Sequence, residues 1–299
     1  MAEVLEQIPL DGWPFDLAAT LGSGQVFHWN QWNGGWVGAI GDEAVFLRQR
    51  DPGFLECSAG KTALVRHYLG LGEDLGPVMA GFRADDAALQ RAIAWCPGLR
   101  LIRQPAWECL ATFITSSLKQ VPQIRAISLR LRERLGEAVR ADGLPCVWSY
   151  PRAEVVAAAG EAFLRECGLG YRAAFLHRSA VAVAEGSCDL QAVAGLDDEE
   201  AQAELCRLHG VGGKVAACVL LFGYGRGGAF PIDVWIERVL RELYFPRARK
   251  LTHARLDRFA WKQFGPQRGL AQQFLFHWAR LTDCGRRAVG PGGEVTVEG

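Results

Sequence analysis

The pattern of apolar and polar positions changes character part-way along the chain. From residue 15 to residue 49 the apolar residues come in short runs, separated by the turn dipeptides Asn33-Gly34 and Gly41-Asp42. Short apolar runs joined by such turns are typical of antiparallel hairpins. We therefore predict a three-stranded antiparallel meander formed by QVFHW (25–29), GWVGAI (35–40) and AVFLRQ (44–49).

From about Asp85 onward the apolar positions recur at the spacing of amphipathic helices, with short breaks at glycine or proline. The predicted helices cover residues 107–118, 124–136, 154–167, 171–186, 198–208, 214–223, 233–243 and 253–265. This change of period predicts an α+β fold. A small N-terminal antiparallel-sheet domain (residues 1–97) is followed by a mostly α-helical domain (98–285), and the glycine-rich residues 286–299 are expected to form a flexible tail.

Composition narrows the class of protein. About half of the 299 residues are apolar and the formal net charge is zero, which favours a globular protein and argues against binding nucleic acid by bulk charge. The longest apolar run, VAACVLLFGY (215–224), is far shorter than the ~20 residues of a membrane span, and the acidic N-terminus lacks a secretion signal. The nine cysteines form no CxxC pair, so a cytoplasmic protein with reduced thiols and no zinc or iron–sulfur site is expected.

Three glycines and a lysine stand between two predicted helices, in LHGVGGKVAAC (208–218). Glycines at 210 and 212 permit positive φ angles and leave backbone amides uncovered. At the start of a helix such amides bind an anion such as phosphate. The segment therefore predicts a helix-hairpin-helix that holds a nucleic-acid backbone through Gly210, Val211, Gly212 and Gly213. The alternative is an ordinary helix–helix turn.

A second chemical signal is Asp233, which directly precedes the predicted helix in PIDVWIERVL. An aspartate at this position caps the helix, and capping alone would explain it. However, a helix that begins at Lys214 carries the chain only roughly 13 Å by residue 222, and the ten residues that follow can span about 33 Å. The chain can therefore return, so that Lys214 and Asp233 face one cleft.

Taken together, residues 208–240 resemble the helix-hairpin-helix, Gly-Pro-rich loop and aspartate motif of base-excision DNA glycosylases. Lys214 is similar to the lysine of their lyase-type members. Three further segments, LGSGQVFHW (21–29), GLRLIRQPAWECLATFITSS (98–117) and LGYRAAFL (169–176), resemble the 8-oxoguanine DNA glycosylase family. The resemblance runs in order over nearly the whole chain.

This resemblance implies a bifunctional DNA glycosylase and AP lyase that flips 8-oxoguanine out of duplex DNA. Lys214 would form a Schiff base with the sugar, and strand cleavage would follow by β-elimination. Asp233 would oppose the developing positive charge. The family implies double-stranded DNA as the partner, a monomer, no required cofactor and no iron–sulfur cluster.

The family also implies roles in base recognition. The Gly24 carbonyl would accept the N7 hydrogen that distinguishes 8-oxoguanine from guanine, and Cys218 would line one face of the flipped base. Thr282 and His277 are candidates for the polar residue that the last helix presents to the base. Tyr171 and Arg172 would lie at the site of extrusion and meet the opposite strand. Each of these residues also has an ordinary structural explanation.

One run departs from the family pattern. In SSLKQVPQ (116–123) Leu118 stands where the family has the asparagine that fills the vacated stack, Lys119 follows it, and Gln123 replaces an arginine. Leucine can wedge between bases but cannot form a hydrogen bond with a base edge. We therefore expect relaxed selectivity for the base opposite the lesion.

Three points stay open at the level of sequence. The family implies a monovalent cation, K⁺ or Na⁺, on the backbone carbonyls of Cys206, Leu208 and Val211. The same scaffold could excise another oxidised or an alkylated base. From a different class, the chain could be a non-catalytic helix-hairpin-helix DNA-binding protein, although holding phosphate requires neither Lys214 nor Asp233.

Overall fold

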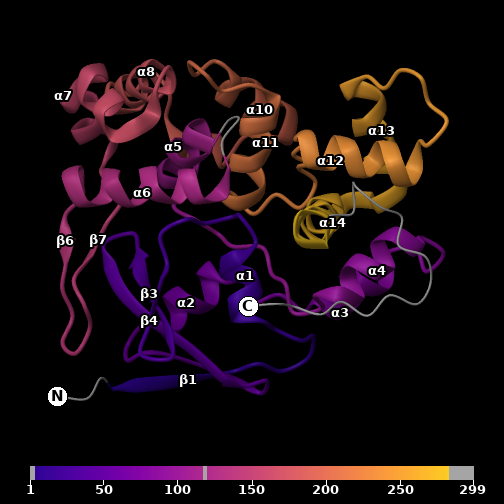
Figure 1. The fold of residues 1–299 in the computed structure, drawn as a ribbon, viewed down its shortest axis with the longest axis horizontal. Coiled ribbons are helices and arrows are strands. Elements are labelled where there is room, and N and C mark those ends of the chain that lie inside the picture. The colour runs from indigo at the N-terminus through magenta and orange to yellow at the C-terminus, as the bar shows by residue number, and fades with distance from the viewer. Residues whose placement is uncertain (1–3, 117–119, 283–299) are drawn as a thin grey trace.

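The computed structural model describes residues 4–116 and 120–282. It has a sheet domain beside a larger group of helices, with α5 and α6 lying between the two (Figure 1). Leu118, Lys119 and the predicted tail 286–299 lie outside the described residues. Within the described ranges, no helix combines the length and apolar character that crossing a membrane requires.

The N-terminal sheet has five antiparallel strands rather than three, in the spatial order β1-β5-β4-β3-β2. The predicted strands 35–40 and 44–49 are confirmed, because they lie in β3 and β4, which pair with Val37 opposite Phe46. β1 and β5 show too little alternation of apolar and polar residues to be recognised from the sequence, and they pair with each other only when the chain folds back. The strands are β1 (Leu5–Pro9), β2 (Asn30–Trp32), β3 (Gly35–Ile40), β4 (Glu43–Asp51) and β5 (Phe54–Ser58).

The prediction of a strand at QVFHW is wrong. Residues 25–29 form an irregular segment between α1 and β2, and all five are buried. Their apolar residues point to more than one side because the segment passes between the sheet and the helices. The Gln25 side chain supplies the hydrogen bonds that a neighbouring strand would have made: its amide donates to the Arg100 carbonyl and its oxygen accepts from the Ile102 amide, both at 2.8 Å.

Four helices in the N-terminal third were not among the predicted helix ranges. They are α1 (Leu17–Gly22), α2 (Thr62–Tyr68), α3 (Leu75–Gly81) and α4 (Ala87–Trp95). α3 and α4 share a hydrophobic cluster with α12 and α14, on the right of Figure 1. The domain boundary at residues 97 and 98 stays a prediction.

The mostly helical second domain, and with it the α+β class, is confirmed. Single π-helical turns extend α7 over Arg165–Leu169 and α12 over Leu240–Tyr244, and a small two-stranded sheet of β6 (Ala138–Val139) and β7 (Val147–Trp148) follows α6. The helices are α5 (Ala106–Ser116), α6 (Val121–Leu135), α7 (Ala153–Leu164), α8 (Arg172–Ala184), α9 (Leu190–Val193), α10 (Asp198–Cys206), α11 (Gly213–Phe222), α12 (Val234–Val239), α13 (His253–Phe264) and α14 (Arg268–Thr282).

Candidate active site

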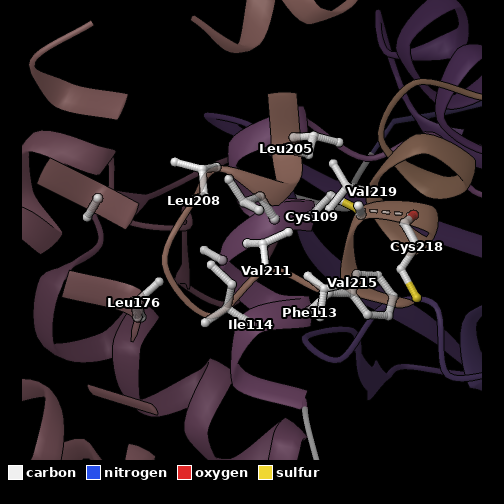
Figure 2. Close-up of a cluster of buried hydrophobic side chains, with 14 of the residues drawn as sticks. Cys109, Phe113, Ile114, Leu176, Leu205, Leu208, Val211, Val215, Cys218 and Val219 are labelled. Atoms are coloured by element: carbon white, nitrogen blue, oxygen red, sulfur yellow. Dashed lines mark hydrogen bonds between the residues drawn. The ribbon is translucent and has the colours of Figure 1, made fainter. Parts of the chain in front are cut away.

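The hairpin between α10 and α11 depends on one left-handed glycine. Gly210 has a φ of +82°, and a Cβ there would lie 2.5 Å from the Phe175 side chain of α8. Gly212 does not need positive φ, contrary to the prediction, because it is the extended N-cap of α11 with a φ of −98°. The hairpin is anchored from inside, where Leu208 and Val211 are buried in the core (Figure 2). Since Gly212 is exposed, the first amides of α11 are open to an anion.

Lys214 lies in the first turn of α11, half-buried beside aromatic rings. Its Nζ is 5.3 Å from the centroid of the Phe113 ring, and Phe113 stacks on Phe222 at the other end of the same helix, with centroids 5.5 Å apart. One turn along from Lys214, Cys218 is buried, and its sulfur points away from the hydrophobic cluster (Figure 2). Burial raises the pKa of the Cys218 thiol to about 11, against the opposing effect of Lys214. Cys218 is therefore a neutral thiol beside the amine.

Asp233 caps α12, as predicted. One of its carboxylate oxygens accepts hydrogen bonds from the amides of Trp235 and Ile236, at 3.0 and 2.8 Å. Burial raises the pKa of this carboxyl, while the two amides and the positive charge of Lys214 act in the opposite direction. The structure thus brings Lys214 and Asp233 within electrostatic reach of each other, although nineteen positions separate them in sequence.

A third part of the site comes from the N-terminal domain. We call residues 22–29 the Gly24 loop. Gly24 has a φ of +84°, and a Cβ there would lie 3.2 Å from the Phe276 ring of α14. From the same helix, Gln273 donates to the Ser23 carbonyl at 3.0 Å. Phe27 in the loop meets Phe113 edge to face, with centroids 6.4 Å apart, so the loop connects directly to the ring beside Lys214.

The face of α14 that meets this loop was missed at the level of sequence. Phe276 is half-buried, and Gln272 lies one helical turn before it on the same face. The Gln272 side chain is buried, and its Oε1 has no hydrogen-bond partner in the described part of the chain. An acceptor buried without a partner is costly unless a ligand supplies the donor. The only local signal was the pair of glutamines, Gln272 and Gln273, within a mostly apolar helical stretch.

The two residues predicted for this role face elsewhere. The His277 ring packs against Trp95 of α4 at a tilt of 59°, with ring centroids 5.3 Å apart, and burial lowers the pKa of His277 to about 4. The Thr282 hydroxyl donates to the Trp278 carbonyl of its own helix at 2.7 Å. Nδ1 of His277, like Oε1 of Gln272, is buried with no hydrogen-bond partner in the described part of the chain. The predicted base contacts of His277 and Thr282 remain untested.

A cavity of about 380 Å³ adjoins the Gly24 loop. Gly24 and Phe27 line it on one side, and Val121 and Arg125 of α6 on the other. Its volume falls in the range of small-ligand sites. A larger groove, of about 720 Å³, lies on the sheet domain, but none of the predicted site residues lines it.

The predicted opposite-strand residues differ in exposure. Tyr171 is half exposed at the start of α8, and Phe175 connects it to His209 of the hairpin through two edge-to-face contacts. Arg172 is buried, with its guanidinium 4.3 Å from the centroid of the Tyr171 ring. Gln123 is exposed in the first turn of α6, where its side-chain oxygen accepts from the Gln120 amide at 3.4 Å. Tyr171 therefore continues the surface of the hairpin.

Among the residues that the structure describes, no group of three or more His, Cys, Asp or Glu side chains is arranged to hold a metal ion. The candidate cation site is made of carbonyls instead. Cys206 ends α10, so its carbonyl belongs to the last turn, which lacks intrahelical partners. The Leu208 carbonyl accepts from the Val211 amide at 3.1 Å and retains a second lone pair. Such carbonyl oxygens are suited to coordinate a weakly bound monovalent cation.

A helix-hairpin-helix that ends in a lysine, with a capping aspartate beside it, defines a DNA glycosylase of the lyase type. The comparisons agree with this class. Residues 7–110 match the model for the N-terminal domain of 8-oxoguanine DNA glycosylases, and residues 112–265 match that of the HhH-GPD superfamily of base excision DNA repair proteins. The chain belongs to the 8-oxoguanine DNA glycosylase family, as its sequence predicted.

Individual relatives cover most of the chain. An N-glycosylase/DNA lyase of Arabidopsis thaliana is 30% identical over 87% of this chain and 76% of its own length. A protein of Methanothermobacter thermautotrophicus named as a probable N-glycosylase/DNA lyase is 30% identical over 66% of this chain, which spans 60% of that relative. The 8-oxoguanine glycosylase/lyase of Clostridium acetobutylicum, solved with duplex DNA containing cytosine opposite 8-oxoguanine, has a TM-score of 0.84 at 25% identity, covering 95% of this chain and all of that one.

The hairpin geometry generates a stability prediction. Gly210→Ala places a Cβ against Phe175 and forces a non-glycine residue to positive φ, so we expect the free energy of unfolding to fall by about 1–3 kcal/mol. Gly212→Ser is the matched control, because its φ is negative, nothing lies within 4 Å, and serine is a good N-cap. Urea denaturation of the two variants measures the difference. Equal losses in both would show that Gly210 carries no special constraint.

Proposed function

We propose that this protein excises 8-oxoguanine from duplex DNA and then cleaves the strand at the resulting abasic site. The observation that carries the proposal is the convergence of three elements: Lys214 at the hairpin exit, Asp233 as its electrostatic neighbour, and the Gly24 loop joined to them through Phe27 and Phe113. A hairpin that only held DNA would need neither the buried carboxylate nor the loop.

DNA binding follows from the outer face of the site. The amides at Gly212, Gly213 and Lys214, together with the hairpin residues Gly210 and Val211, would hold the phosphates of the damaged strand. Such contacts position the duplex without reading its sequence. The exposed ring of Tyr171 would support the DNA where the damaged base leaves the stack. We propose double-stranded DNA as the partner of a monomeric enzyme.

The flipped base would be recognised between the two domains. The Phe276 ring and the Cys218 side chain would contact its two faces, and the Gly24 carbonyl would accept the N7 hydrogen that guanine lacks. The unpartnered Oε1 of Gln272 is suited to accept a hydrogen bond from the base edge. The half-buried state of Phe276 supports this assignment, because a ring poised to stack on a ligand retains exposed area.

The chemistry uses Lys214 and Asp233. The neutral amine attacks C1′, the C1′–N9 bond breaks, and the base leaves with the electron pair and takes up a proton. Asp233, held by two amides in a partly desolvated position, opposes the positive charge that develops on the sugar. Loss of the amine's protons and opening of the sugar give a Schiff base. Removal of a C2′ proton then expels the 3′ phosphate by β-elimination.

The remaining predicted features belong to this proposal. The carbonyls of Cys206, Leu208 and Val211 would hold K⁺ or Na⁺, which would stiffen the hairpin, and no other cofactor is required. As an enzyme acting on the genome it would work in the cytoplasm, at the nucleoid of a bacterium, or in the nucleus of a eukaryote. Selectivity for the opposite base would be relaxed, because Gln123 is exposed and already caps α6.

Replacing Lys214 tests the nucleophile. Lys214→Gln should still bind duplex DNA containing 8-oxoguanine, because the hairpin amides remain, but should form no borohydride-trapped adduct. The readout is the covalent complex on a denaturing gel, with duplexes carrying other oxidised or alkylated bases as parallel substrates. An undiminished adduct would remove Lys214 from its role. An adduct absent from the unmodified protein on every lesion would favour a non-catalytic DNA-binding protein.

Replacing Asp233 separates capping from catalysis. Asp233→Asn keeps a capping oxygen, so stability should fall by no more than ~1 kcal/mol, whereas single-turnover excision should fall by at least about a hundredfold. Because burial raises the pKa of Asp233 and the charged form is needed, excision by the unmodified enzyme should be lost as the pH falls through that raised value. The variant should lack this acid limb. A loss of activity that merely followed the loss of stability would contradict the catalytic role.

The opposite base tests the departure at residues 116–123. One well-placed hydrogen bond gives ~1–3 kcal/mol of discrimination, so excision opposite C, T, G and A should span less than about a hundredfold. The measurement uses four duplexes that differ only at that base, with enzyme in excess. A preference for cytosine of about a thousandfold or more, the product of at least two such contacts, would show that another residue reads the partner base.

A further inference from the structure

A buried ionic cluster joins the two domains at the C-terminal end of the Gly24 loop. Arg132 of α6 donates to Oε1 of Glu108 on α5, and also to the Trp148 carbonyl at 3.0 Å. The same Glu108 oxygen lies 3.5 Å from Nδ1 of His28, a residue of the Gly24 loop. All three residues are at most 5% exposed. The mechanism proposed above uses none of them.

The geometry at His28 requires a proton. Nε2 of His28 lies 2.9 Å from the Ala39 carbonyl of β3, which can only accept, so Nε2 carries a hydrogen. In a neutral ring Nδ1 then presents a lone pair to Glu108. A carboxylate also only accepts, and two acceptors facing each other in a buried site repel. The contact becomes favourable only when one proton lies between Nδ1 and Oε1.

Burial decides which partner carries that proton. It raises the pKa of Glu108 and lowers that of His28, because the low dielectric disfavours both charged forms. Arg132 lowers both pKa values, and Arg125 further lowers that of His28. The other titratable groups around Glu108 are Tyr68, Tyr150 and Cys109, whose pKa values are all raised by burial, so they stay neutral. Both effects of burial move the shared proton away from His28 and toward Glu108.

The cluster acts on the substrate site through the backbone. His28 is four residues from Gly24, and Phe27 beside it meets Phe113. We propose that His28 and Glu108 hold one shared proton across the domain interface, and that this proton keeps the Gly24 loop in the position at which Gly24 meets the base. Both are positioning residues. The inference relies on the proposed role of Gly24 in base recognition, but the proton itself can be measured without substrate.

Glu108→Gln is the decisive variant. Because the same Glu108 oxygen meets both Arg132 and His28, a glutamine that accepts from Arg132 presents that oxygen to Nδ1 as well, so the variant lacks the shared proton at every pH. The unmodified enzyme should lose loop order as Glu108 ionises. We therefore expect the ratio of single-turnover excision rates, variant over unmodified, to rise at least about threefold as the pH is raised across the range in which both proteins stay folded. Using the ratio cancels pH effects that the two enzymes share, and a ratio that stays flat or falls overturns the proposal.

His28→Gln provides a second variant with a matched control. It cannot bond both Ala39 and Glu108, so it should raise KM for lesion DNA more than it lowers kcat. His177→Gln removes a histidine whose Nε2 likewise lies near a carbonyl, that of Ala157 at 3.1 Å, and should leave both constants unchanged. Equal effects of the two changes would contradict a positioning role.

Nuclear magnetic resonance of the histidine ring nitrogens tests the proton directly in the unmodified protein. His28, assigned by its absence from His28→Gln, should be a ring protonated at Nε2, with an Nδ1 shift that moves as Glu108 ionises on raising the pH. Constant shifts of both nitrogens up to about pH 9 overturn the proposal even if Glu108→Gln does not fold. A moving shift together with an inactive enzyme would contradict the proposed function instead.

Discussion

The Phe113 ring is the contact on which the rest of the site depends. It stacks on Phe222, lies under Lys214 and meets Phe27 of the Gly24 loop. One buried ring thereby fixes both ends of α11 against α5 and connects them to the N-terminal domain. Apolar contacts of this kind tolerate little displacement in a close-packed interior. The Lys214 amine and the Gly24 loop are therefore held in fixed positions relative to each other, although they come from different domains.

The electrostatic surroundings of Asp233 are the second feature of the site. Asp233 receives two backbone hydrogen bonds and lies near Lys214, but burial still dominates and raises its pKa. A carboxylate held by fixed amides in a partly desolvated position needs no reorganisation when positive charge develops nearby. The capping role and the proposed catalytic role thus use the same contacts. The helix end supplies the amides that keep the charge in place.

The domain interface is polar where the Gly24 loop crosses it. The Gln25 side chain forms hydrogen bonds with the backbone of Arg100 and Ile102, and Gln104 donates to the Gln25 carbonyl at 2.9 Å. At the C-terminal end of the loop, His28 contacts Glu108, which pairs with Arg132. Buried polar groups are directional, so a loop held by them has one position, whereas an apolar loop could slide. This explains why an irregular segment, rather than a strand, carries Gly24.

The sequence alone determined the features that depend on neighbours along the chain. The hairpin glycines, Lys214, the Asp233 cap and most helix positions were predicted because turn, cap and period are local properties. The tertiary structure alone decided what depends on packing between distant segments. β1 and β5 joined the sheet, QVFHW came to lie in an interface, and Phe276 of α14 came to lie against Gly24. A helix buried on several sides has no polar face to show which side meets the Gly24 loop, so only the folded chain decides it.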